Sequence, residues 1–200
     1  MLLPRYPVYV PSKGRAAYGQ TMKFLLRDAC PFFLVVEPQE ANAYQQAFPA
    51  ATLLPLPWNN RGLVAARNWI KDHATAAGHA RHWQLDDNMC RFRRRFHGRR
   101  IPCQAGAALR ITEDFVDRYE NVAVAGINYV MFARNDSLVP PFLLNVHIYS
   151  CSLILNALPY GWRLRYNDDT DLCLRVLADG WCTVQMNIFL VEKIATMLVT

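Results

Sequence analysis

The chain has 200 residues, of which 52% are hydrophobic and 19% are charged, and its 22 lysines and arginines outnumber its 16 acids. This composition excludes a disordered chain, a collagen and a coiled coil, and it is typical of one folded domain. The six cysteines are scattered without a CxxC pair, so we expect reduced, buried thiols in a cytoplasmic protein.

The first half alternates short apolar strands with amphipathic helices. Pro4 and Pro7 interrupt the apolar start of the chain, which therefore does not look like a signal peptide. Strands are expected at 7–11, 32–36, 52–56 and 82–85, and helices at 16–29, 39–48 and 63–77. This order predicts an α/β fold with a mostly parallel sheet flanked by helices. The loops that follow the strands should converge on one crevice; they are 12–15, Glu37, 59–62 and 86–88.

The second half departs from this alternation. Helices are expected at 112–120 and 168–179, and strands at 122–126, 129–132, 146–155 and 181–189. Residues 137–162 contain no charged side chain, but their prolines and amides argue against a membrane span. His97 and His147 stand alone in aromatic or apolar surroundings, and we interpret them as ordinary core or surface residues.

One segment carries the whole positive excess of the chain. Residues 91–100 read RFRRRFHGRR and contain six arginines and no acid. Guanidinium groups pair with phosphates, and the interleaved aromatic rings can stack on exposed bases, so the segment predicts binding to a polyanion. The alternative is a solvated basic hairpin without a partner. The six residues are Arg91, Arg93, Arg94, Arg95, Arg99 and Arg100.

Two acidic motifs are candidates for chemistry. Asp86-Asp87-Asn88 follows the strand at 82–85 directly, and adjacent carboxylates repel each other unless cations or hydrogen-bond donors compensate. Mg²⁺ and Mn²⁺ favour such oxygen ligands, although an Asx turn is the better explanation of this motif when it is taken alone. Residues 167–171 read NDDTD at a helix start, where capping accounts for one or two carboxylates but not for three. A further carboxylate there could act as a general base.

A third motif lies at the start of the helix expected at 63–77. Gly62, Arg67 and Asn68 stand around a helix N-terminus, where backbone N–H groups and arginines attract an anionic phosphate. The signal is weak alone, because surface arginines are common.

The order of these motifs resembles a known family. The runs NNRGLVAARNWI, HWQLDDN and NDDTDLCLRVLADGW resemble the nucleotide-sugar-binding half of GT-A glycosyltransferases of the family 2-like group. Through VYVPSKGR, FLVVEP, WQLDDN and YNDDTDLCLRVLADGW, the chain is similar in finer detail to the TET-associated glycosyltransferases of phage DNA hypermodification systems. The resemblance covers nearly the whole chain.

The resemblance implies a GT-A, Rossmann-like fold in a single domain over 1–200. Residues 1–90 would bind the nucleotide sugar, and 91–200 would form a smaller mixed region on the acceptor side. It implies Mn²⁺ or Mg²⁺ on Asp87, shared with Asp86 and Asn88. It also implies that the nucleotide sugar contacts Pro11, Ser12, Arg15, Glu37, Gly62, Arg67, Asn68 and Asp86.

The implied activity is transfer of a sugar from a nucleotide-sugar donor to 5-hydroxymethylpyrimidine in DNA, with 5-hydroxymethylcytosine as the first choice. Asp169, beside Asp168, matches the position of the family's catalytic base, and Asp171 would cap and orient the helix. The arginine segment would hold the DNA phosphates. A phage-encoded enzyme of this kind would act in the host cytoplasm, without a membrane partner.

The chain departs from the family pattern in two ways. Asn88 supplies a neutral amide at the third position of the metal motif. The chain also stops after FLVEKIATMLVT, where such enzymes commonly add a metal ligand, which implies either a truncated chain or weaker metal binding.

Three other functions stay open at this point. They are a GT-A enzyme acting on a polysaccharide, lipid or protein, a non-catalytic DNA-binding protein on the same scaffold, and a metal nuclease.

Overall fold

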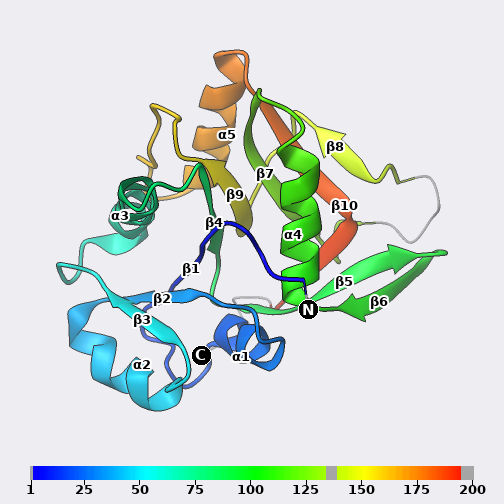
Figure 1. The fold of residues 1–200 in the computed structure, drawn as a ribbon. Coiled ribbons are helices and arrows are strands. Elements are labelled where there is room, and N and C mark those ends of the chain that lie inside the picture. The colour runs from blue at the N-terminus through cyan, green and yellow to red at the C-terminus, as the bar shows by residue number, and fades with distance from the viewer. Residues whose placement is uncertain (1, 134–138, 195–200) are drawn as a thin grey trace.

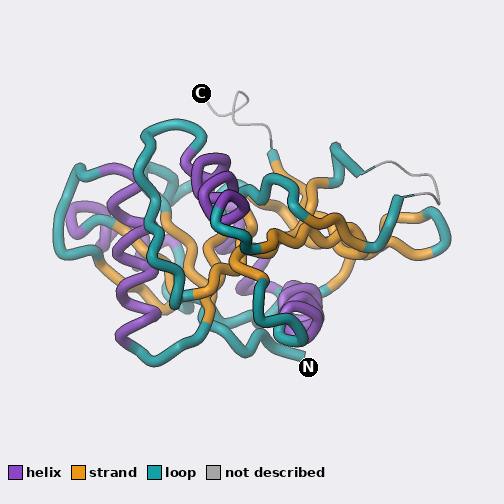
Figure 2. Tube along the Cα trace, turned by 90° about the horizontal axis from the view of Figure 1, so that it is seen from above, coloured by secondary structure: helices purple, strands orange, loops and turns teal. Residues whose placement is uncertain are grey.

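The computed structural model describes residues 2–133 and 139–194, and its centre is a sheet of ten strands (Figure 1). Nine strands form the continuous order β3-β2-β1-β4-β9-β7-β10-β5-β6, and β8 pairs with β10. Helices lie on both sides of these strands (Figure 2). None of the helices in the described ranges is long and apolar enough to cross a membrane.

The first four strands are parallel, as their order in the sequence predicts. They are β1 (Val8–Pro11), β2 (Phe33–Val36), β3 (Thr52–Pro55) and β4 (Arg81–Leu85). The intervening helices are α1 (Gln20–Arg27), a 3₁₀ turn (Pro38–Glu40), α2 (Ala41–Ala47) and α3 (Gly62–Ala76). Alternate residues of β1 face opposite layers, because Val8 and Val10 pack in the α1 cluster and Tyr9 packs in the α3 cluster.

The remaining strands make the sheet mixed, so the expectation of a mostly parallel sheet is wrong for the second half. They are β5 (Met89–Phe96), β6 (Arg99–Cys103), β7 (Val122–Tyr129), β8 (Phe142–Leu144), β9 (Cys151–Leu155) and β10 (Cys182–Lys193). Strand β9 inserts antiparallel between β4 and β7, and in this half only the β7–β10 pair is parallel. The arginine segment forms the β5–β6 hairpin, whose two-residue turn requires the positive φ angles of His97 and Gly98.

Two helices complete the layers of the second half. Helix α4 (Ala105–Val116) packs in the same cluster as α1, and α5 (Asp168–Ala178) packs on the opposite face against β7 and β9. All six cysteines are unpaired, and three of them are only half-buried.

Several element boundaries differ from the predictions. Helix α1 begins at Gln20 because residues 15–19 form a turn closed on the Arg15 carbonyl. The helix expected at 112–120 is α4, which begins and ends earlier. Tyr129 is the last residue of β7, and a turn follows at 130–132 in place of the separate strand expected at 129–132. Strand β10 continues to Lys193, four residues beyond its predicted end, and the boundary drawn at residue 90 falls inside β5.

Candidate active site

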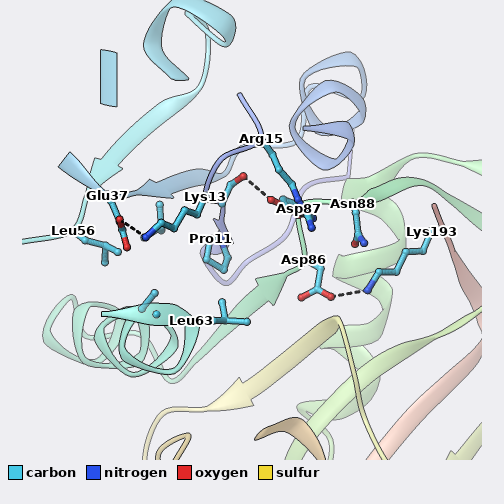
Figure 3. Close-up of a pocket in the computed structure, with 14 residues that line it drawn as sticks. Pro11, Lys13, Arg15, Glu37, Leu56, Leu63, Asp86, Asp87, Asn88 and Lys193 are labelled. Atoms are coloured by element: carbon cyan, nitrogen blue, oxygen red, sulfur yellow. Dashed lines mark hydrogen bonds and ion pairs between the residues drawn. The ribbon is translucent and has the colours of Figure 1, made fainter. Parts of the chain in front are cut away.

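A pocket opens at the carboxyl ends of β1 and β4, where the predicted loops converge (Figure 3). The convergence of these loops is therefore confirmed. One wall is apolar and consists of Val35, Leu56, Leu63 and Ala66. Eight of the predicted site residues line the pocket: Pro11, Ser12, Arg15, Glu37, Gly62, Asp86, Asp87 and Asn88.

Glu37 is a buried acid held by a pocket cation. It is 5% exposed, and Lys13 Nζ lies 2.8 Å from its Oε2. Burial raises the pKa of Glu37, but the hydrogen bond and charge of Lys13 outweigh it and leave the pKa below its usual value. Glu37 is therefore ionised at neutral pH and offers a hydrogen-bond acceptor at the β2 end of the pocket.

Asp87, in the loop after β4, is connected by hydrogen bonds to the loop after β1. Its carboxylate accepts hydrogen bonds from Ser12 Oγ at 2.6 Å and from Arg15 Nη1 at 2.5 Å. The hydroxyl of Tyr44 lies 2.7 Å from Ser12 Oγ and accepts from the Arg15 backbone N–H. These contacts compensate the cost of burying a carboxylate that is only 8% exposed.

Asp86 is surrounded by donors from three other elements. Its Oδ2 accepts hydrogen bonds from Lys193 Nζ at 2.8 Å and from Ser150 Oγ at 2.5 Å, and its Oδ1 lies 3.3 Å from Arg67 Nη2. Burial raises the pKa of Asp86, but the charges of Arg67 and Lys193 outweigh it and lower the pKa overall. Asp86 is thus ionised and fixed.

Arg67 joins the two acidic motifs. Its guanidinium is buried and makes ion pairs to Asp86 at 3.3 Å and to Asp168 Oδ2, from Nε, at 3.2 Å. The contact with Asp168 lacks hydrogen-bond geometry, so both atoms have no hydrogen-bond partner. Burial raises the pKa of Asp168, and the charge of Asp169 adds to this effect despite Arg67. Motifs that lie about 80 residues apart in the sequence therefore meet at one arginine.

Asn68 holds the loop before α5 instead of lining the pocket. Its Nδ2 donates to the Trp162 carbonyl at 2.7 Å, and its Oδ1 accepts from the Trp162 N–H at 2.8 Å. Gly161 permits this approach, because a Cβ there would lie 2.5 Å from Asn68 Oδ1. A contact of Asn68 with the nucleotide stays a prediction.

The start of α5 presents Asp169 beside a histidine that the sequence gave no reason to single out. His147 Nε2 lies 3.3 Å from Asp169 Oδ2 and 3.2 Å from Thr170 Oγ1. Asp169 and His147 are 28% and 42% exposed, so both are accessible to a ligand. Asp171 does not cap the helix by a side-chain hydrogen bond; it pairs with Arg163 and Arg175, both at 2.8 Å.

The six predicted DNA-binding arginines differ in their exposure and in their contacts with the rest of the protein. Arg91 and Arg93 lie 3.5 and 2.8 Å from Glu192, and Arg100 donates to the Ala133 carbonyl. Arg95 donates to the Val139 carbonyl at 3.3 Å. Arg94 and Arg99 are exposed, and the Arg94 guanidinium stacks 4.8 Å from the ring centre of Phe96. The hairpin thus offers two exposed arginines and four that contact the protein.

The two carboxylates expected to bind a divalent ion do not fit one in this arrangement. Asp87 is paired with Arg15, and Asp86 is paired with Arg67 and Lys193, so each carboxylate already has a cation. Within 2–133 and 139–194, no three His, Cys, Asp or Glu side chains gather as metal ligands. Only Asn88 Oδ1 is a buried oxygen of the motif without a partner. Any ligand supplied by 195–200 lies outside the described residues.

Three site residues were missed by the sequence predictions. Lys193 and Ser150 contact Asp86, and His147 contacts Asp169. No motif in the sequence marks any of the three as a site residue, and Lys193 stands beside Glu192 like an ordinary surface charge. Only the pairing of β9 and β10 with the central strands brings Ser150 and Lys193 to the pocket.

The comparisons place the chain in a family. A model of the TET-associated glycosyltransferase family matches residues 6–200. Because this match spans nearly the whole chain, the protein belongs to the TET-associated glycosyltransferase family and is a glycosyltransferase. None of the curated proteins searched matches the chain.

Proposed function

We propose that the protein transfers a sugar from a nucleotide-sugar donor to the hydroxyl group of a 5-hydroxymethylpyrimidine in DNA, with 5-hydroxymethylcytosine as the first acceptor to test. The observation that carries this proposal is the junction of the two acidic motifs at Arg67. It puts a charged pocket next to an accessible carboxylate, and a glycosyl transfer needs both.

The donor is proposed to occupy the pocket after β1 and β4. The apolar wall suits a nucleobase, and Ser12 and Glu37 offer polar groups to the base or the ribose. Arg15 and Arg67 are ion-paired with the acidic motif, and they would offset the charge that grows on the leaving diphosphate.

Asp169 is proposed as the general base of an inverting reaction. The acceptor hydroxyl oxygen attacks C1 of the sugar, its proton passes to the Asp169 carboxylate, and the bond between C1 and the phosphate oxygen breaks. The nucleoside diphosphate leaves with that electron pair. His147, 3.3 Å away, would orient the carboxylate.

The DNA is proposed to contact the exposed side of the β5–β6 hairpin. Arg94 and Arg99 would pair with phosphates, and the exposed Phe96 offers a ring for stacking. Presenting the hydroxymethyl group to Asp169 would require extrusion of the base, which costs a few kcal/mol. The other four predicted arginines contribute to DNA binding in this proposal only if they leave their protein contacts.

Mass spectrometry of nucleosides tests the proposed activity. Hydroxymethylated DNA is incubated with the protein and a panel of nucleotide sugars, then digested. A hexose or pentose mass gain on hydroxymethylcytosine is expected, and it should disappear with Asp169→Asn. Asp179→Asn, an exposed acid at the other end of α5, is the matched control and should keep the gain. Sugar transfer to a polysaccharide or protein but never to DNA would contradict the proposal.

A further inference from the structure

The side chain of Lys193 reaches the pocket from strand β10, which belongs to the second half of the sheet. It is the last residue of β10, its side chain is 18% exposed, and it lines the pocket with Asp86 (Figure 3). Its Nζ donates to Asp86 Oδ2 at 2.8 Å and to Ser150 Oγ at 3.0 Å, and lies 3.3 Å from the Tyr129 hydroxyl. Because three oxygen atoms surround this ammonium group, its position in the pocket is fixed, and it is not a solvated surface charge.

The backbone explains how Lys193 reaches this position. The pairing of β10 with β5 skips one residue of β5, because Glu192 is opposite Arg91 and Lys193 is opposite Met89. Successive side chains of a strand point to opposite faces of the sheet. Glu192 turns to Arg91 and Arg93 on the hairpin, whereas Lys193 turns to Asp86. The Ile194 N–H donates to the Asn88 carbonyl, which fixes the end of the strand against the Asp86-Asp87-Asn88 loop.

The ammonium group of Lys193 fills the space beside Asp86 Oδ2 in which a divalent ion on this oxygen would lie. A divalent ion on the same carboxylate oxygen would be repelled by the ammonium group in this partly buried site. Lysine is also a common ligand of phosphate groups, which it contacts as a point charge. The start of α3, where Gly62 and Leu63 line the same pocket, offers backbone N–H groups to the same phosphates.

We propose that Lys193 replaces the divalent ion of this site. Its ammonium group binds the diphosphate of the donor together with Arg15, which lines the same pocket, and the buried charge of Arg67 supports them, so that donor binding and sugar transfer need no metal. This inference rests on the proposed function, since it concerns the donor of that reaction.

Donor binding with and without metal tests the inference. Titration calorimetry first finds which of UDP, GDP, ADP, CDP and dTDP binds the protein, and that nucleotide is then titrated in EDTA and in Mn²⁺. The wild-type Kd should be the same in both conditions within about twofold. In EDTA, Lys193→Met should weaken binding by about tenfold or more, because a charged partner of the phosphates is lost.

Two further variants sharpen the comparison. Lys193→Arg should keep metal-independent binding, because it keeps a cation beside Asp86. Mn²⁺ should restore affinity to Lys193→Met, in which Asp86 is left without the ammonium. Lys23→Met, which removes an exposed lysine of α1, is the matched control and should bind like the wild type.

Two results would overturn the inference. The first is a wild-type protein that loses the nucleotide in EDTA and regains it with Mn²⁺, a result that leaves the proposed function intact. The second is Lys193→Met binding in EDTA as tightly as Lys23→Met. If Lys193→Met does not fold, as judged by circular dichroism, the wild-type comparison alone decides. If none of the five nucleotides binds any form, the proposed function fails, and the inference fails with it.

Discussion

The two halves of the sheet build the site in different ways. The parallel strands β1 to β4 supply the walls of the pocket, because their carboxyl ends lie at one edge and their loops meet there. The mixed half supplies charges and anchors from several directions: Ser150 precedes β9, Lys193 ends β10, and Asp169 lies in the first turn of α5. In the proposed function, the first half therefore selects the donor and the second half carries out the transfer.

Removing the carboxylate of Asp169 should distinguish the roles of the two halves most clearly, because it should change the transfer rate and not the donor affinity. Asp169→Asn is expected to lower the transfer rate by about 10²–10⁴-fold, the usual contribution of a general base. Donor affinity should stay unchanged, because Asp169 does not line the pocket. Single-turnover kinetics and calorimetry on the same sample measure the two effects. An equal loss of affinity and rate would mean that the halves do not divide the work in this way.

Arg67 is the link between the halves, so its loss should damage both. Arg67→Met leaves the carboxylates of Asp86 and Asp168 without their shared buried cation. We expect a loss of about 3–5 kcal/mol in the free energy of unfolding, together with weaker donor binding. Urea denaturation measures the first effect. Arg118→Met, an exposed arginine just after α4, is the control and should change stability by less than about 0.5 kcal/mol.

His82 lies where β4 of the first half pairs with β9 of the second half, and it should make the free energy of unfolding depend on pH. His82 on β4 is fully buried; its Nε2 accepts from Gln84, which leaves Nδ1 to donate to Asn156 beyond β9. Burial lowers the pKa of His82 to about 4, despite the hydrogen bond to Asn156. The unfolded state therefore takes up a proton at higher pH than the folded state does.

The neutral His82 therefore contributes fully to the free energy of unfolding above about pH 6.5. This contribution, about 3 kcal/mol, is lost as the pH falls toward 4. Denaturation at a series of pH values measures this loss. His82→Gln should flatten the curve over that range. A wild-type curve and a variant curve with the same slope would contradict the assignment.

The hairpin should give the smallest effect. Arg94→Ala combined with Arg99→Ala is expected to weaken DNA binding by about tenfold at low salt and to reduce the salt slope by about 2, since each phosphate contact contributes about 0.9. Fluorescence anisotropy across salt concentrations measures both. The single change Arg118→Ala serves as the control for charge outside the hairpin. An unchanged slope would favour an acceptor other than DNA.

The difference between the halves also decides what the sequence could predict. Strand and helix alternate through β1 to α3, so the positions of Ser12, Glu37 and Asp87 follow from the rule for parallel strand ends. The second half follows no such rule, because β9 inserts antiparallel between distant strands. A sequence pattern states that β9 is apolar but not which strands it joins.

Two local features differ from the predictions for physical reasons. The helix expected to begin at 112 begins at Ala105, and its Gly106 leaves room for the N-terminal segment, because a Cβ there would come within 2.4 Å of the Leu2 carbonyl oxygen. Lys193 lies beyond the predicted end of β10, and it reaches the pocket only because the strand continues to this residue and ends beside Asp86. Both signals depend on contacts between distant segments.

The central claim is that the pocket and the start of α5 form one reaction site. The most direct measurement is a crystal structure of the Asp169→Asn variant with the donor and a hydroxymethylcytosine oligonucleotide. Our account predicts the diphosphate against Arg67 and Lys193, and the acceptor hydroxyl about 3 Å from the side chain at position 169. A donor bound elsewhere, or an acceptor hydroxyl far from position 169, would contradict it.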